Sequence, residues 1–243
     1  MEGKHLITPK DIENKTMTPA KRAEAKNSYF AFYVGRPLSY ILTIPLLYLN
    51  ISPNIVTIVS ILCSFIGFAF LSFGAGIKYQ LIGLLFFFLW NMGDGIDGNI
   101  ARYKNLKSST GDMLDTLGGY LAMALIILGM GNAAYNTASK VVILSRTFPM
   151  IIGGLSAIFT LIPRLLMHRK LAMSSEHSKA SGLKNKESYG ILKIIALNIC
   201  DPAGFQEVIM LIAILMGWNL YFTIVYFFVN LAMMIYSLKN LCD

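Results

Sequence analysis

Long uninterrupted apolar runs constrain this chain more than any other feature of its sequence. The run that follows Ser52 continues to about Phe73 without a charged residue, and comparable runs recur along the chain. About 20 apolar residues in a helix span a bilayer. Only 14% of the 243 residues are charged and 55% are hydrophobic, whereas a soluble domain carries about 25% charged residues. The sequence therefore predicts an all-α polytopic membrane protein.

Six transmembrane helices are expected, separated by glycine, proline and polar residues. Ser52 and Pro53 are typical of a helix N-cap and first helical position, and Asp201 and Pro202 repeat that pattern before the fifth apolar run. The second helix is expected to continue through Asp94. The expected spans cover roughly residues 53–73, 79–92, 109–130, 141–167, 203–216 and 220–238.

The N-terminal part of the chain differs from the rest. Residues 1–28 are polar and mixed in charge, so we expect a flexible cytoplasmic segment there, followed by a single membrane domain over residues 29–243. Residues 29–50 are aromatic and apolar but contain one glycine and two prolines. Because such a segment suits the membrane surface better than the bilayer interior, an interfacial amphipathic helix is expected before the first span.

The distribution of basic residues predicts the orientation. With a cytoplasmic N-terminus and six alternating spans, 18 of the 21 Lys and Arg residues lie on the cytoplasmic side, as the positive-inside rule requires. Basic residues there also suit anionic lipid headgroups. The net charge of +8 is thus explained by the membrane, and no nucleic-acid partner is expected. The same topology places the junction of the second and third spans in the cytoplasm.

Four aspartates gather at that junction. They are the only acidic residues between Glu24 and Glu176. A carboxylate within an apolar segment is costly and marks a functional site by default. A plain solvated turn is the alternative interpretation, because two glycines lie among these residues. The four are Asp94, Asp97, Asp112 and Asp115.

The spacing of these residues favours a site over a turn. On a helix, two carboxylates and two small residues fall within an arc of about 100°, namely Asp94, Asp97, Gly98 and Ala101. Gly111 and Asp115 share a face of the next helix. Small residues let helices approach closely and leave room for a ligand. Converging carboxylates suit hard cations such as Mg²⁺ or Mn²⁺, and two such ions would bind a phosphoryl group.

The complete pattern resembles a known family signature. Asp94-x2-Asp97-Gly98-x2-Ala101-Arg102-x8-Gly111-x3-Asp115 is similar to the motif of the CDP-alcohol phosphotransferase (CDP-alcohol phosphatidyltransferase) family, with seven of eight fixed positions matching. Pro53-Asn54-x2-Thr57 is similar to the family's Pro-Asn-x2-Thr element near the cytidine. Members of that family transfer a substituted phosphoryl group from a CDP-linked donor to an alcohol and release CMP.

The resemblance implies roles for the matching residues. Asp94, Asp97 and Asp115 would bind Mg²⁺ or Mn²⁺, and a guanidinium such as that of Arg102 suits phosphate oxygens. The donor would be CDP-diacylglycerol or a CDP-polyol, and the acceptor an alcohol or a phosphorylated polyol. Family members are commonly homodimers, which the small residues of the spans permit. The residues implied in nucleotide binding are Asn54, Thr57, Gly98, Ala101, Arg102 and Gly111.

The eighth position departs from the family pattern. Gly119 stands where the family has an aspartate held to bind a second metal ion and to deprotonate the acceptor, so the site would hold two ions or only one. Asp112 lies on a similar helix face but about 10 Å away along the axis. Three interpretations stay open: another base, such as Asp112 or a substrate phosphate; an acceptor that needs little assistance; or binding without turnover.

Two further alternatives accompany this interpretation. Arg164, near the cytoplasmic end of the fourth span, would bind an acceptor phosphate or would only anchor the helix at the interface. The intramembrane carboxylates would also suit a cation transporter, although transport sites tend toward the bilayer midplane. The sequence thus favours a transferase over a catalytically impaired relative that binds nucleotide and metal, and both over a transporter.

Overall fold

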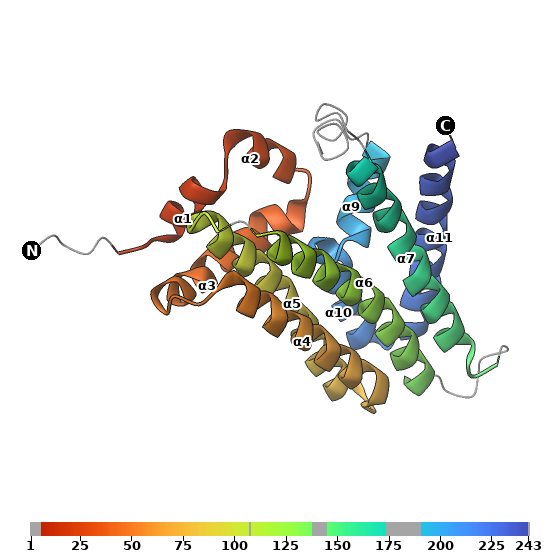
Figure 1. Ribbon diagram of the computed structural model, residues 1–243. Coiled ribbons are helices and arrows are strands. Elements are labelled where there is room, and N and C mark those ends of the chain that lie inside the picture. Colours follow the sequence, from red (N-terminus) through yellow and green to blue (C-terminus); the bar gives the residue numbers. More distant parts are fainter. Residues whose placement is uncertain (1–5, 107, 138–144, 174–190, 243) are drawn as a thin grey trace, which may run out of the picture.

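The computed structural model describes residues 6–106, 108–137, 145–173 and 191–242. All regular secondary structure within these ranges is helical (Figure 1). The predicted all-α class is therefore confirmed. The start of the expected fourth span and the polar segment 174–187 lie outside the described residues.

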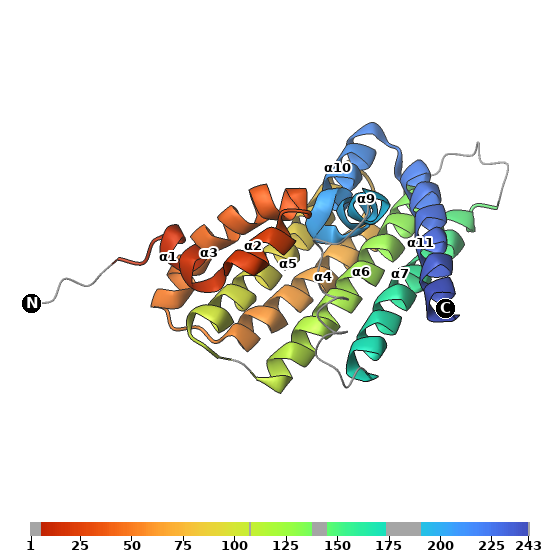
Figure 2. The ribbon, with the colours of Figure 1, turned by 90° about the horizontal axis from the view of Figure 1, so that it is seen from above.

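Five long helices form the body of the molecule and run side by side (Figures 1 and 2). They are α4 (Pro53–Phe73), α5 (Ile77–Tyr103), α6 (Ser109–Thr137), α7 (Phe148–Met173) and α11 (Asn219–Cys242). Shorter elements pack around them, with α9 and α10 on one side next to α5 and α11. These are α1 (Pro9–Thr16), α2 (Pro19–Ala25), the short π-helix η1 (Ala31–Gly35), α3 (Arg36–Tyr48), α9 (Ile191–Cys200), the short π-helix η3 (Pro202–Gln206) and α10 (Glu207–Met216).

Local sequence signals set several helix ends where they were expected. The Ser52 side chain accepts a hydrogen bond from the backbone N–H of Ile55 at the start of α4. The Asp201 side chain accepts a hydrogen bond from the backbone N–H of Ala203 at the start of η3 in the same way. Gly217 ends α10 in the left-handed conformation, with φ of 69°, which costs glycine little.

Four of the described helices are long and apolar enough to cross a bilayer. These are α4, α6, α7 and α11, and residues Pro202–Met216 form a shorter apolar helix. Helix α5 is equally continuous, as expected, because it extends from Ile77 through the motif to Tyr103. Six spans remain a prediction for α5 and for the shorter η3–α10 segment. The four long apolar helices nevertheless identify the chain as an integral membrane protein.

The N-terminal segment is more ordered than its composition suggests. Thr8 and Thr18 each cap a short helix through the side-chain oxygen, and a proline follows each of them. Ile12 on α1 is fully buried and packs in a cluster with residues of α3 and α5. The expectation of a flexible start was therefore wrong for α1 and α2. A helix does follow at α3, while its interfacial position remains a prediction.

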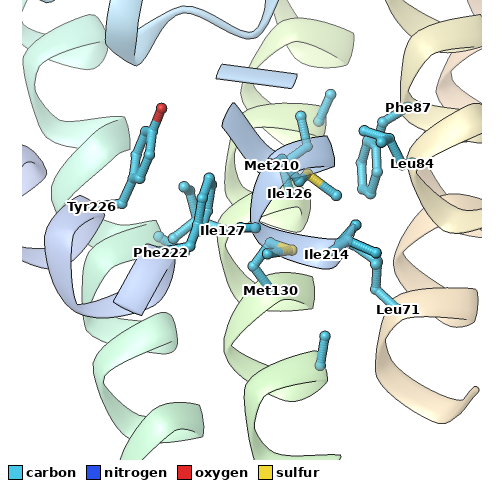
Figure 3. Close-up of a cluster of buried hydrophobic side chains, with 14 of the residues drawn as sticks. Leu71, Leu84, Phe87, Ile126, Ile127, Met130, Met210, Ile214, Phe222 and Tyr226 are labelled. Carbon is cyan, nitrogen blue, oxygen red and sulfur yellow. The ribbon is translucent and has the colours of Figure 1, made fainter. Parts of the chain in front are cut away.

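A single large apolar cluster fills the interior of the bundle (Figure 3). Phe87 of α5 and Leu71 of α4 meet Ile126 and Met130 of α6 there, all with essentially no exposed surface. The same cluster includes Met210 and Ile214 of α10, and Phe222 and Tyr226 of α11. The cluster joins α4, α5 and α6 to α7, α10 and α11, while a second cluster joins α1, α3 and α5.

Close helix contacts depend on glycine at a few positions. A Cβ at Gly131 of α6 would lie 2.8 Å from the carbonyl oxygen of Pro149 and 3.0 Å from the Cα of Gly153 on α7. Both neighbours are backbone atoms, so they cannot rotate away. Helices α6 and α7 therefore approach each other as small-residue pairs do in membranes.

We expect Gly131→Ala to lower the free energy of unfolding by about 1–3 kcal/mol, because overpacking forces backbone shifts. Thermal unfolding of the detergent-solubilised protein would measure this. Gly154→Ala is the matched control, since a Cβ there meets only the Leu128 Cδ1 atom at 4.0 Å. Equal unfolding temperatures for the two variants would contradict the packing argument.

Candidate active site between α5 and α6

One open cavity of about 990 Å³ lies between the end of α5 and the start of α6. Helix α1, which packs on α5, stands beside this end of the bundle (Figure 1). All candidate site residues from the sequence except Arg164 contribute to the cavity wall. They are Asn54, Thr57, Asp94, Asp97, Gly98, Ala101, Arg102, Gly111, Asp112 and Asp115. The structure thus brings together residues separated by up to 61 positions.

The most enclosed carboxylate is held by a hydrogen bond between helices. Asp97 is only 4% exposed, and its Oδ2 accepts from the Thr57 hydroxyl of α4 at 2.5 Å. The same hydroxyl also contacts the Pro53 carbonyl of its own helix at 3.1 Å. A buried carboxylate is costly unless it is hydrogen-bonded. Thr57 therefore stabilises and orients Asp97, in addition to lining the cavity.

A pair of carboxyl groups joins α5 to α6. The carboxyl groups of Asp94 and Asp115 lie within hydrogen-bonding reach of each other, and Asp97 interacts electrostatically with both. Adjacent like charges repel, and a divalent cation would offset this repulsion. Carboxylate oxygens are the ligands that Mg²⁺ and Mn²⁺ prefer. The donor chemistry of this pair therefore fits a divalent cation.

The carboxylates do not yet form a complete coordination sphere. Within the described ranges, no three Asp, Glu, His or Cys side chains come close enough together to form a metal-binding group. Asp94 and Asp115 meet directly, whereas the Thr57 hydroxyl holds one oxygen of Asp97. Asp112 is exposed and also borders the cavity. The predicted ligands share one wall, and their joint binding of metal remains a prediction.

Arg102 follows Asp94 and Asp97 on α5 and interacts electrostatically with Asp97 and with Asp115 of α6. Its Nη2 donates to Asn99 Oδ1 at 3.1 Å, and Asn99 in turn donates to Ser39 and Thr43 of α3. A Cβ at Gly98 would lie 2.8 Å from the Arg102 Nη1 atom. The glycine therefore leaves the space that the guanidinium occupies. Arg102 is held in place on one side and open to the cavity on the other.

Two further basic residues line the cavity from the N-terminal part of the chain. They are Lys21 of α2 and Arg36 at the start of α3. The sequence analysis did not assign them to the site, because it treated residues 1–28 as flexible. The signal was available in the Thr18-Pro19 pair, which is typical of a helix start. With Arg102, they give the cavity three basic residues in addition to its four aspartates.

Arg164 and Gly119 are not among the described residues that line the cavity. The Arg164 Nη2 atom instead lies 3.5 Å from Asp201 Oδ2, and both side chains are partly exposed. The backbone carbonyl of Arg164 accepts a hydrogen bond from the Tyr120 hydroxyl at 3.4 Å. The role of Arg164 in phosphate binding therefore stays a prediction.

A helical membrane protein with acidic and basic residues lining one cavity is suited to binding a metal-complexed phosphate ester. The chain matches the CDP-alcohol phosphatidyltransferase family over residues 50–236. It therefore belongs to that family. Its members are metal-dependent transferases that move a phosphatidyl group from a CDP-linked donor to an alcohol. No match to a curated protein was found.

The Thr57–Asp97 contact can be tested by removing one hydroxyl. We expect Thr57→Val to weaken Mn²⁺ binding about 10-fold, because residues that orient metal ligands typically contribute 10- to 100-fold to affinity. Electron paramagnetic resonance titration of the purified protein would measure the dissociation constant. Thr223→Val is the matched control, since Thr223 is buried and donates to the Asn219 carbonyl of its own helix. Equal affinity in both variants would contradict the orienting role.

Proposed function

We propose that this chain is a membrane-embedded CDP-alcohol phosphotransferase whose active site faces the cytoplasm. It moves a phosphatidyl or polyol-phosphate group from a CDP-linked donor to an alcohol, with release of CMP, in phospholipid or related polyol-phosphate biosynthesis. The observation that carries this proposal is the single cavity that gathers the motif residues of α4, α5 and α6. Membership of the transferase family supports the same reaction class.

Different residues of the cavity lining suit the diphosphate and the nucleoside of a CDP-linked donor. Arg36 and Arg102 bind non-bridging oxygens of the diphosphate, since guanidinium groups suit phosphate geometry. Gly98 and Ala101 leave room for the diphosphate against α5. Asn54 and Thr57, together with Gly111, face the nucleoside end. A Cβ at Gly111 would lie 3.1 Å from Asn54 Oδ1, so a side chain there would compete for that space.

Asp94, Asp97 and Asp115 would hold the divalent cations. When bound, Mg²⁺ or Mn²⁺ stabilises negative charge on the attacking and leaving oxygens of a phosphoryl group. The protein supplies the rest by positioning. Arg102 neutralises the departing CMP, and Thr57 keeps Asp97 oriented. The site would hold two ions, or only one because position 119 offers no carboxylate.

The acceptor approaches from the side of Arg164. A phosphorylated polyol would give Arg164 a stronger partner than Asp201, because a phosphate accepts charge-assisted hydrogen bonds from guanidinium. The observed ion pair is long, at 3.5 Å, so exchange of one anion for another is inexpensive. Association of two copies through small residues of the spans stays a prediction.

The main alternative is a catalytically impaired relative that binds nucleotide and metal, and Gly119 favours it. A cation transporter is less well supported. The acidic residues lie at one end of the bundle, and the apolar cluster of Figure 3 fills the interior beyond them. An ion path through Phe87, Ile126 and Met130, which are all fully buried, would need these helices to separate.

Release of CMP tests the proposed reaction directly. Purified protein incubated with labelled CDP-diacylglycerol or a CDP-polyol, Mg²⁺ or Mn²⁺ and a panel of alcohols is expected to release CMP only when metal is present. Asp94→Asn is expected to abolish CMP release and metal binding together, because it removes one member of the carboxyl pair. If no donor yields metal-dependent CMP, the transferase proposal is wrong. Nucleotide binding that persists in that case would identify the impaired relative.

The acceptor site can be tested through Arg164. We expect Arg164→Gln to raise the KM for phosphorylated acceptors about 10-fold or more, since a charge-assisted contact contributes roughly 1.5–3 kcal/mol. The KM for unphosphorylated alcohols should change little. Arg169, which is exposed on the same helix, provides Arg169→Gln as the matched control. Equal KM changes for both acceptor classes would show that Arg164 only anchors the helix.

A further inference from the structure

The turn of α6 that follows Asp115 leaves an open space where a side chain would stand. A Cβ built on Gly119 meets no described atom within 4 Å. Side chains of the neighbouring helices therefore do not fill the position. Transfer to an alcohol nevertheless needs a group that accepts the hydroxyl proton. If Asp94, Asp97 and Asp115 bind metal, that group has to come from elsewhere.

The junction between α9 and η3 reaches the α5 turn of Asp94. Asn91, which lies one turn before Asp94, donates from Nδ2 to the carbonyl oxygen of Pro202 at 3.2 Å. Asp201 precedes that proline, and its negative charge acts on the Asp94 carboxyl group. Ala203, which follows the proline, lines the cavity. Asp201 therefore belongs to a junction that borders the cavity on the side of α5.

The same junction also reaches the level of Gly119. Asp201 Oδ2 lies 3.5 Å from Arg164 Nη2 on α7. The carbonyl oxygen of Arg164 accepts a hydrogen bond from Tyr120, the residue after Gly119. Asp201 is thus connected to the α5 turn of Asp94 on one side and to the α6 turn of Gly119 on the other.

The backbone holds Asp201 in place through Oδ1, while Oδ2 pairs, among the described residues, only with Arg164 at 3.5 Å. Asp201 Oδ1 accepts from the N–H of Ala203 at 3.2 Å, as an N-cap does. The following turn is interrupted at Gly204, whose φ and ψ of −89° and −139° are not helical. Gly204 packs so closely on Asn198 that a Cβ would lie 2.3 Å from its carbonyl oxygen. The side chain of Asp201 is still 26% exposed, so a small molecule can reach Oδ2.

The other carboxylates near the cavity are less suitable. Glu207 is 4% exposed, and its carboxylate oxygens have no contact with solvent in the described structure. Asp112 is exposed at the start of α6, one turn before Asp115 and two turns before Gly119. It therefore lies on the far side of Asp115 from the space beside Gly119. Asp201 combines partial exposure with a fixed position beside Ala203, which lines the cavity.

We propose that Asp201 is the general base that deprotonates the acceptor alcohol, an inference that rests on the proposed transferase function. The hydroxyl proton moves to Asp201 Oδ2 as the hydroxyl oxygen bonds to the β-phosphorus of the donor. The bond from that phosphorus to the bridging oxygen breaks, and its electron pair leaves with CMP. A phosphorylated acceptor replaces Asp201 as the partner of Arg164, which frees Oδ2 to accept the proton. Asp201 later releases the proton to water.

The variant Asp201→Asn tests this assignment without removing the helix cap, because Asn and Asp cap helices equally well. With CDP-diacylglycerol, Mn²⁺ and the best acceptor of the panel, we expect the rate of CMP release to fall about 100-fold or more, as loss of a general base does. The donor KM, the Mn²⁺ dissociation constant and the thermal unfolding temperature should stay near those of the wild type. Asp112→Asn should cause a smaller loss than Asp201→Asn.

Restoring a carboxylate at the open position provides a second test. We expect Gly119→Asp, added to Asp201→Asn, to raise the rate about 10-fold or more over the single variant, because a base would again face the acceptor. Gly119→Asn in the same background is the matched control, since it adds equal bulk but a far weaker proton acceptor. Equal rescue by both residues would show that bulk explains the effect and would contradict the proposal.

Other outcomes would also overturn the assignment, and they are distinguishable from failure of the proposed function. A wild type that releases CMP, combined with an Asp201→Asn rate within about threefold of it, would leave the transferase intact and exclude Asp201 as the base. Joint loss of rate and Mn²⁺ binding in Asp201→Asn would make Asp201 a metal ligand or a structural residue. A wild type that binds Mn²⁺ but releases no CMP from any donor would contradict the transferase itself.

Discussion

The cost of placing carboxylates at the end of an apolar helix bundle governs the structure around the site. Asp97 is almost completely buried, and such a group is retained only where other groups compensate it. The Thr57 hydroxyl does so from α4 at 2.5 Å. This contact requires α4 and α5 to lie close together. Gly67 of α4 and Gly83 of α5 permit that approach farther from the site, since a Cβ on either would lie 2.9 Å from the carbonyl oxygen of the other.

The basic residues of the cavity depend on the same arrangement. Arg102 is fixed by Asn99, and Asn99 is fixed by two hydroxyl groups of α3. Helix α3 therefore positions Arg102 of α5, the residue proposed to bind phosphate, besides contributing Arg36 to the cavity. The close packing of Ile12 against α3 and α5 extends this support to the N-terminal helices. The site consequently depends on the whole N-terminal half of the chain rather than on the motif alone.

Local patterns in the sequence predicted the parts of this site that local chemistry controls. The start of α4 follows from Ser52 and Pro53, and the continuation of α5 through Asp94 follows from helical spacing. The gathering of motif residues in one cavity was expected for the same reason. The Asp201–Arg164 pair was not predicted, because nothing in the spacing of residues 37 positions apart indicates contact. The N-terminal helices were missed because polar composition outweighed the capping signal at Thr8 and Thr18.

Gly119, where the motif resemblance leads us to expect a carboxylate, would separate two requirements that a single motif otherwise combines. Binding of metal and nucleotide draws on α4, α5 and α6, whose contacts stay intact around Asp94 and Asp97. Proton acceptance, with Asp201 as the base, draws on the α9–η3 junction instead. That junction is held by the interrupted turn at Gly204 and by the Asn91 contact with Pro202. A shift of α10 relative to α5 would therefore change turnover while leaving donor binding unaltered, because it moves the base but none of the metal ligands.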